Sequence, residues 1–152
     1  MPALDYYAVA NAIKSILEAS ADLAGVTVVV EKEHTFTAGA EPWIGIYVER
    51  RDPSPSQYLD AGQSTRYQIR FSIWVWCMSI EDTERAIKVR NELVGKVEKV
   101  LMANRTLNNL VSMSWLLGGE LPSGRLSSEN DEAIYLSGGE TILVAETTTS
   151  TV

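Results

Sequence analysis

Few residues of this chain have the chemistry that catalysis or metal binding requires. Its 152 residues include one cysteine, Cys77, and one histidine, His34. A single cysteine cannot form an internal disulfide, and we find no carboxylates at the spacing that would complete a zinc site with these two residues. Three carboxylates, Glu49, Asp52 and Asp60, could act as general acid and base if they were buried close together. They lie in a polar region with no histidine or lysine in register, so we expect no catalytic residue, no metal and no cofactor.

Motifs with a known chemical role are absent from the sequence as well. The chain contains no GxGxxG, Walker A, HExxH or GxSxG pattern. The paired glycines at 118–119 and 138–139 do not stand between a strand and a helix, and we interpret both pairs as turns or strand irregularities. We expect Cys77 to be a small buried hydrophobic residue and His34 to be an exposed loop residue.

Composition is that of an ordinary folded protein. With 45% hydrophobic and 22% charged residues, the chain is predicted to form a single domain over residues 1–152. The net charge of −7 argues against nonspecific binding to a phosphate backbone. No apolar run is long enough to span a bilayer and the first residues carry no cationic leader, so we expect no membrane association and assembly in the cytoplasm.

Hydrophobic periodicity divides the first half of the chain into elements. Apolar residues recur at three- and four-residue steps over residues 5–19, which predicts an amphipathic helix that stops by about residue 23. The β-branched run at residues 26–31 predicts a buried strand, and residues 42–51 alternate as a second strand. Residues 52–64 contain two prolines, three serines and a glycine and predict a long loop.

The second half begins with the strongest strand signal in the chain. Residues 65–77 alternate so that one face carries Tyr67, Ile69, Phe71, Ile73, Val75 and Cys77. A second amphipathic helix is predicted to start at Ser79. Residues 111–117 predict a strand, and residues 133–148 a strand or hairpin broken at the glycine pair; a turn-rich connection joins them, and residues 148–152 are expected to be frayed.

The order of these elements predicts the fold class. Strands that follow one another without helices favour an antiparallel sheet. We therefore expect an α+β fold: a two-layer, mostly antiparallel sheet with two helices packed on one face, in the order α-β-β-β-α-β-β. Large aromatic residues are mostly buried, so we expect Trp43 and Trp115 in the core and Trp74 and Trp76 in the core beneath the second helix, although the latter two could instead line a groove between subunits.

Four segments carry a resemblance to a known family. They are LAGVTVVVE after the first helix, PWIGIYVERR, the long strand RYQIRFSIWVWC, and the helix EDTERAIKVRNELVGKVEKVL that follows it directly, with a closing pair of β segments. In this pattern the chain resembles the tail terminator, or tail completion, proteins of long-tailed bacteriophages over nearly its whole length. The resemblance implies a hexameric ring in the virion tail or neck that stops tail-tube polymerisation and offers a surface for head attachment. The implied partners are further copies of the chain, the tail tube protein and head-tail connector proteins, with DNA only as passing cargo.

Two groups of residues are candidates for such contacts. A ring needs one patch of each subunit to meet a different patch of the next. We expect interface residues around the long loop: Arg50, Arg51, Asp52, Tyr58 and Leu59. The alternative is that the aromatic and apolar side chains of the loop fold back on their own domain while the arginines are solvated.

Negative charge is concentrated near the end of the chain. From Thr106 onward there are six acidic residues and one basic residue. Three of the acids, Glu129, Asp131 and Glu132, could line a channel that repels DNA, or they could simply keep a loop soluble. Two other functions stay open: a head-to-tail connector or adaptor of the same virion, and a cytoplasmic module that binds a peptide or ligand.

Overall fold

A computed structural model describes residues 5–32, 42–53, 64–79, 83–127 and 133–150 of the chain. The first helix, α1, spans Tyr6–Glu18 and is capped by Asp5, whose carboxylate accepts hydrogen bonds from the backbone N–H groups of Tyr7 and Ala8 at 3.0 and 3.1 Å. Such a cap satisfies two of the N–H groups that a helix start leaves unpaired. The helix ends at Glu18, before the limit near residue 23 that the sequence predicts. One short 3₁₀ turn, η1 (Ala21–Leu23), then leads into the sheet.

Six strands and a second helix make up the rest of the described chain. In order they are β1 (Thr27–Val30), β2 (Trp43–Pro53), β3 (Ser64–Ser79), α2 (Thr83–Met102), β4 (Met113–Leu117), β5 (Ser123–Ser127) and β6 (Ala133–Ser150). The strand order in the sheet is β1-β2-β3-β6-β4, and β5 pairs with the other end of β6. Only the β1–β2 pair is parallel. The predicted α+β fold with its mostly antiparallel sheet is confirmed.

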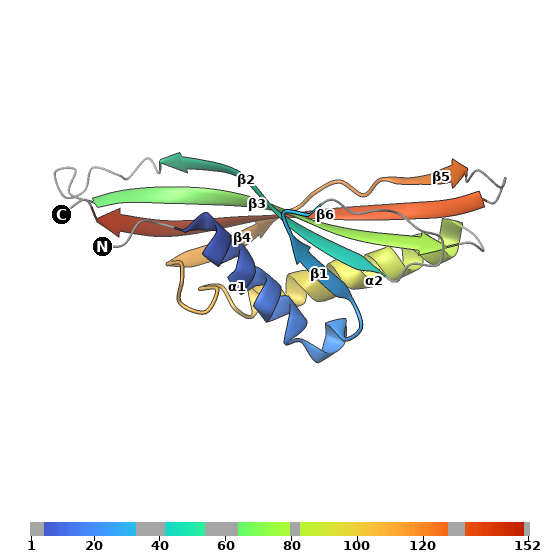
Figure 1. Ribbon diagram of the computed structural model, residues 1–152, viewed down its shortest axis with the longest axis horizontal. Coiled ribbons are helices and arrows are strands. Elements are labelled where there is room, and N and C mark those ends of the chain that lie inside the picture. Colours follow the sequence, from blue (N-terminus) through green and yellow to red (C-terminus); the bar gives the residue numbers. More distant parts are fainter. Residues whose placement is uncertain (1–4, 33–41, 54–63, 80–82, 128–132, 151–152) are drawn as a thin grey trace.

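The hydrophobic core lies between the sheet and the two helices, which pack on the same face (Figure 1). On β3 the predicted alternation is confirmed, because Ile69, Phe71, Ile73, Val75 and Cys77 are all buried. Ala86, Leu93, Val97 and Leu101 bury the stripe of α2 that meets them. Burial of alternate strand residues against a helical stripe is the arrangement that the two hydrophobic periods dictate.

The pairing of β3 with β6 dominates the sheet. These strands pair antiparallel from Ser64 with Ser150 to Ser79 with Tyr135. In Figure 1 they form a long ribbon with β2, and one end of the ribbon, near the chain termini, extends beyond α1. A strand of this length exceeds what the helices can cover, so part of the sheet stands clear of the core.

Several predicted boundaries are wrong. Strand β2 includes Asp52 and Pro53, and β3 begins at Ser64, so the segment between the strands is shorter than the predicted loop over 52–64. Helix α2 starts at Thr83 because β3 continues to Ser79. The connection predicted as turns contains strand β5, and the tail predicted as frayed is paired through Ser150. In each case a long partner strand supplies hydrogen-bonding groups that local sequence does not reveal.

The glycine pair at 138–139 does not interrupt β6. A Cβ at Gly138 would lie 2.4 Å from the ring of Trp76, whereas a Cβ at Gly139 would lie 2.5 Å from Val94 of α2. The two glycines therefore make room on opposite faces of one continuous strand.

Candidate interaction surface

One face of the sheet is left without a helix among the described residues. Register shows which residues share it, because directly paired residues of neighbouring strands lie on the same face. Trp43 pairs with Trp76, which pairs with Gly138; Gly45 pairs with Trp74, which pairs with Glu140. Two further rows of paired residues extend this face to β4. The first row is Tyr47, Ser72, Ile142 and Leu117, and the second is Arg70, Val144 and Trp115.

Aromatic rings occupy the centre of this face. Trp74 and Trp76 stack with their ring centroids 5.1 Å apart and their planes 9° from parallel. Both are half-buried, Tyr47 beside them is half-buried, and Trp43 is buried. We call Trp43, Tyr47, Trp74 and Trp76 the aromatic face. Placing Trp74 and Trp76 beneath α2 was wrong, because the residues that β3 turns toward the helices are the alternate ones, Ile73, Val75 and Cys77.

Small residues allow these rings to lie flat on the sheet. A Cβ at Gly45 would lie 2.8 Å from the ring of Trp43 and 2.6 Å from the hydroxyl of Tyr47. Gly138 makes the same kind of room for Trp76. Glycine inside a strand usually weakens it, so two glycines under the rings indicate that flat packing of the aromatic face is part of the fold.

Polar groups on the same face are held by specific partners. The hydroxyl of Ser72 donates to a carboxylate oxygen of Glu140 at 2.8 Å, next to Trp74 in the register. The hydroxyl of Tyr47 donates to the backbone carbonyl of Lys32 at 2.9 Å. A partner chain that covered this face would therefore meet a mostly apolar centre with one fixed carboxylate, which is the composition of an interface core.

A shallow apolar pocket extends the aromatic face toward β5. It has a volume of about 190 Å³ and is lined by Trp76, Pro122, Ser123, Gly124 and Leu136. Further along the same edge of β6, β4 exposes Met113 and Leu117 by 49% and 40%. Apolar side chains are thus exposed near β5 and on β4, and exposed apolar surface is typical of a protein-protein contact.

The predicted interface residues at the projecting end of the sheet are only partly described. Arg50 and Asp52 form an exposed ion pair with 2.8 Å between Nη2 and Oδ1. The guanidinium of Arg51 lies over the ring of Tyr6 on α1, 5.9 Å from its centroid, so this arginine folds back on its own domain. Tyr58 and Leu59 lie outside the described residues. The structure therefore brings Arg50 and Asp52 together and separates Arg51 from them.

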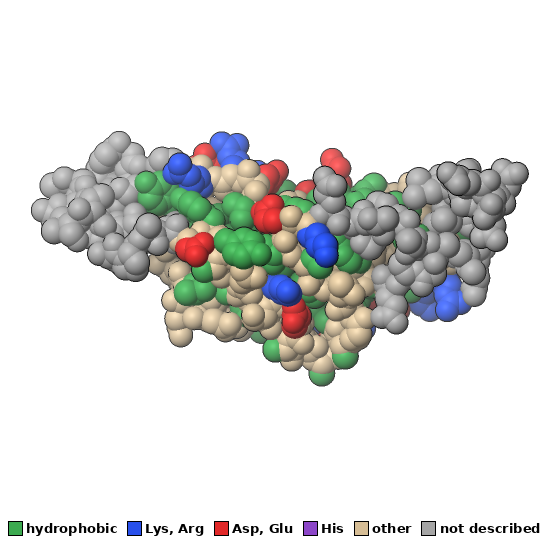
Figure 2. All heavy atoms as spheres, viewed as in Figure 1, with side chains coloured by type: hydrophobic (Ala, Val, Ile, Leu, Met, Phe, Trp, Pro, Cys, Tyr) green, Lys and Arg blue, Asp and Glu red, His purple; other side chains and the backbone are tan. Residues whose placement is uncertain are grey.

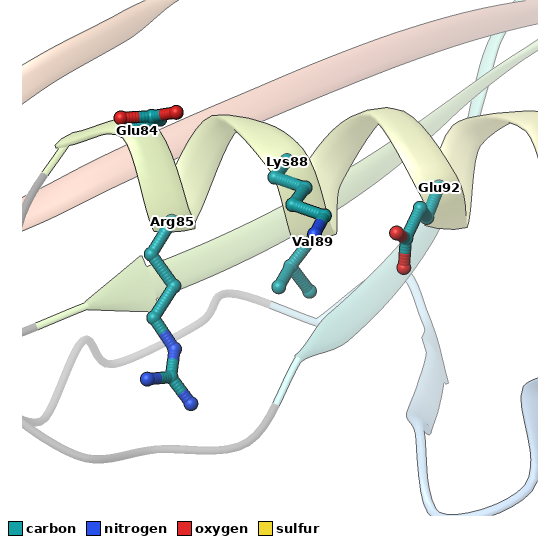
Figure 3. A pocket seen from close by; sticks show the side chains of 5 residues that line it. All are labelled: Glu84, Arg85, Lys88, Val89 and Glu92. Carbon is teal, nitrogen blue, oxygen red and sulfur yellow. The ribbon is translucent and has the colours of Figure 1, made fainter.

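A second hollow lies along the first turns of α2 (Figure 3). It has a volume of about 470 Å³, and its described lining consists of Glu84, Arg85, Lys88, Val89 and Glu92. Two acids, two bases and one valine on a solvent-facing helix surface provide no group of distinctive chemistry. On the side of the molecule in Figure 2, basic and acidic side chains are likewise interspersed. The acids proposed to line a channel, Glu129, Asp131 and Glu132, lie outside the described residues.

The remaining chemical candidates do not form a site in the described part of the chain. Cys77 is buried as predicted, and burial raises the pKa of its thiol to about 12 against an opposing effect of the Arg90 charge. Arg90 is itself buried and donates to the backbone carbonyls of Pro122 and Gly138 at 3.2 and 3.0 Å, which ties α2 to β6. Of the remaining candidates, Glu49 is exposed at the edge of the sheet, and His34 and Asp60 lie outside the described residues.

The described residues contain neither a cluster of metal ligands nor a helix suited to span a membrane. No group of three histidine, cysteine or acidic side chains among them could hold a metal ion. Neither described helix is both long and apolar enough to cross a membrane. A comparison of the sequence with known protein families and with curated proteins finds no match.

Proposed function

We propose that this chain is a structural subunit of a bacteriophage tail, a tail terminator that forms a ring on the tail tube and presents a surface for head attachment. The observation that carries the proposal is the aromatic face, four aromatic side chains on the side of the sheet that no described helix covers. The resemblance of the sequence to tail terminators indicates the kind of assembly, a ring on a phage tail. The aromatic face is a surface through which such an assembly could be contacted.

The whole side of the sheet that carries the aromatic face is large enough for a stable contact. Strands lie about 4.8 Å apart and rise about 3.3 Å per residue, so four strands along the length of β3 cover on the order of 1,000 Å². A stable interface buries about 800 Å² on each partner. Tryptophan and tyrosine side chains near the centre of an interface contribute most of its binding free energy. We therefore expect Trp74 and Trp76 to contribute most of the binding free energy of a partner on this face.

In this function the chain works by contact alone. Its partners are other copies of itself, the tail tube protein and the head-tail connector proteins, and DNA passes through the ring without specific binding. The net charge of −7 suits a wall along which DNA slides, because phosphates are repelled rather than bound. We assign no catalytic residue, metal or cofactor.

Mass measurement in solution tests the proposal. We expect the purified chain, alone or mixed with tail tube protein, to form a ring that light scattering detects as a multiple of 16.7 kDa. Trp74→Ser and Trp76→Ser should weaken the association of the chain with the tail tube protein at least tenfold. Tyr7→Ser is the matched control, because Tyr7 is 56% exposed on α1 and lies away from the aromatic face. A chain that stays monomeric with the tube protein and instead binds a peptide would contradict the proposal.

Electron microscopy of particles that lack the chain separates terminator from connector. Tail tubes of uncontrolled length are the expected result, because a terminator stops polymerisation. Normal tails detached from filled heads would instead assign the chain to the joining of head and tail.

A further inference from the structure

Three strands, β1, β4 and β5, have outer edges that no described strand pairs with, and β1 and β4 lie at the two ends of the strand order β1-β2-β3-β6-β4. β1 pairs only with β2, and β4 pairs only with β6. Each outer edge is therefore a row of backbone N–H and C=O groups with no partner strand in the described chain. Such a row is a template for pairing with another chain.

Both strands are short, with four and five residues, but neither contains a charged residue, a proline or a bulge that would block such pairing. No charged residue occurs from position 106 to position 119, a segment that includes all of β4, and none occurs in β1. β4 also exposes Met113 and Leu117. Natural proteins protect a solvent-exposed edge with charges, proline or a bulge, so an uncharged apolar edge indicates a strand that another strand covers.

The part of β2 that β1 does not cover has the protective features that β1 and β4 lack. It carries four consecutive charged residues from Glu49 to Asp52, an irregularity in the pairing between Val48 and Arg50, and Pro53. Strand β5, the third edge strand, carries a charge as well, Arg125, so among the described edges those of β1 and β4 alone lack such protection. The contrast within one sheet points to β1 and β4 as the strands used for assembly.

The strand directions make these two edges complementary. β1 is parallel to β2, and each later step from β2 through β3 and β6 to β4 is antiparallel. β1 and β4 therefore run in opposite directions. In a ring whose axis runs roughly along the strands, β4 of one subunit therefore meets β1 of the next in the antiparallel sense, over five and four residues respectively.

We propose that β4 of each subunit pairs antiparallel with β1 of the next copy, so that the sheets join around the ring. This inference rests on the proposed ring and names the contact that builds it. It leaves the aromatic face open to the neighbouring proteins of the virion. Joining an unprotected edge to a different unprotected edge of the next copy also removes both edges when the ring closes.

Sheet geometry leaves two registers in which Trp115, the middle residue of β4, has a partner within β1. Thr27 and Val29 share the face of Trp43 and Gly45, while Met113, Trp115 and Leu117 share the face of Glu146, Val144 and Ile142. Because opposed residues of a continuous sheet lie on one face, Trp115 must oppose Thr27 or Val29. The first register places Met113 opposite Val29, and the second places Leu117 opposite Thr27.

Paired cysteines test the contact and its direction. Two double variants, Met113→Cys with Val29→Cys and Leu117→Cys with Thr27→Cys, cover the two registers. After mild oxidation we expect one of them to give a ladder of covalent oligomers on a denaturing gel and the four single variants to stay monomeric. The buried thiol of Cys77 should not take part, because its pKa is about 12. Dimers from a single β4 variant would overturn the proposal in favour of a twofold pair of β4 strands.

A charge placed on the edge provides the second measurement. Leu117→Lys should shift the mass in solution from ring to monomer, because pairing would bring the ammonium group against the next subunit. Leu121→Lys is the control, since Leu121 is 55% exposed and lies beyond β4, and it should leave the ring intact. A ring that forms equally well with both variants and gives no ladder would overturn the edge contact and leave the proposed function standing. A wild-type chain that forms no ring, with or without tube protein, would contradict both.

Discussion

Replacement of Gly138 by alanine tests whether the glycine lets Trp76 lie flat on the sheet. A Cβ at this position would lie 2.4, 2.7 and 2.7 Å from three carbons of the Trp76 ring, closer than such atoms approach in real structures. The backbone at Gly138 is not in the left-handed region, so alanine can adopt its conformation. The obstacle is therefore the indole ring alone, and Trp76 must move for alanine to fit.

The loss in free energy of unfolding caused by Gly138→Ala has two contributions. Excess volume in a packed site costs about 1–3 kcal/mol. Loss of the stack of Trp76 on Trp74 adds about 0.5–1.5 kcal/mol. Because Trp76 is only half-buried and can turn toward solvent, the lower part of the combined range applies. We expect Gly138→Ala to lower the free energy of unfolding by about 2 kcal/mol, which corresponds to a melting temperature about 4–8 °C lower for a chain of this length.

Urea unfolding followed by circular dichroism is the assay, because the substitution alters tryptophan fluorescence directly. All variants should be compared at one protein concentration, since association stabilises the folded state. Gly124→Ala is the matched control: it lies on the neighbouring strand β5, and its Cβ would meet nothing within 4 Å. We expect the control to change stability by less than about 0.5 kcal/mol.

A double-mutant cycle with Trp76→Leu isolates the contact. If the ring is the obstacle, Gly138→Ala should cost far less in the Trp76→Leu background, with a coupling free energy above about 1 kcal/mol. An unchanged cost in that background, or a Gly138→Ala protein as stable as the wild type, would refute the steric argument.

Three further predictions concern other parts of the fold. Gly95→Ala should raise the free energy of unfolding by about 0.5–1 kcal/mol in a thermal melt, because Gly95 is exposed within α2 and has open space for a Cβ; a loss of stability would contradict this. Arg90→Leu should lower it by about 1–3 kcal/mol in urea, because the carbonyls of Pro122 and Gly138 lose a buried donor, and Arg90→Lys should recover part of the loss. Burial raises the pKa of Cys77 from 9.0 to about 12, so the folded state keeps this proton longer than the unfolded state. Stability should therefore be unaffected by this group below pH 9 and should fall between pH 9 and 12 by up to about 1.4 kcal/mol per pH unit, relative to a Cys77→Ala variant measured in parallel.

The parts of the fold with strong periodicity were predictable. Alternation in β3 identified the buried residues from Ile69 to Cys77, and the stripe on α2 identified the helix face that covers them. β5 was not predictable, because Ser123–Ser127 has no hydrophobic alternation and becomes a strand by pairing with β6. The end of β6 was missed for the same reason, since Thr148–Ser150 pairs with the first residues of β3. Local propensity does not reveal a strand that depends on a distant partner.

The candidate surface was identified only in part. Interface residues were expected around Arg50 and Asp52, and these two residues pair with each other at the projecting end of the sheet. The favoured prediction placed Trp74 and Trp76 beneath α2, because large aromatic side chains are usually buried, and kept a groove between subunits as the alternative. One signal was available in the sequence: two tryptophans at alternate positions, set between residues already assigned to the core face, must point away from that face.

What the amino-acid sequence determined by itself is which residues share a side of each strand and each helix, because the periods of 2.0 and 3.6 residues are local properties of the backbone. Tertiary structure alone decided which side of the sheet the helices cover, and with it whether the tryptophans of β3 lie in the core or on an open face. It also decided which strands became the edges, since strand order follows from pairings between residues as distant as Ser64 and Ser150. Those choices depend on the packing of the whole chain, and no local pattern of residues encodes them.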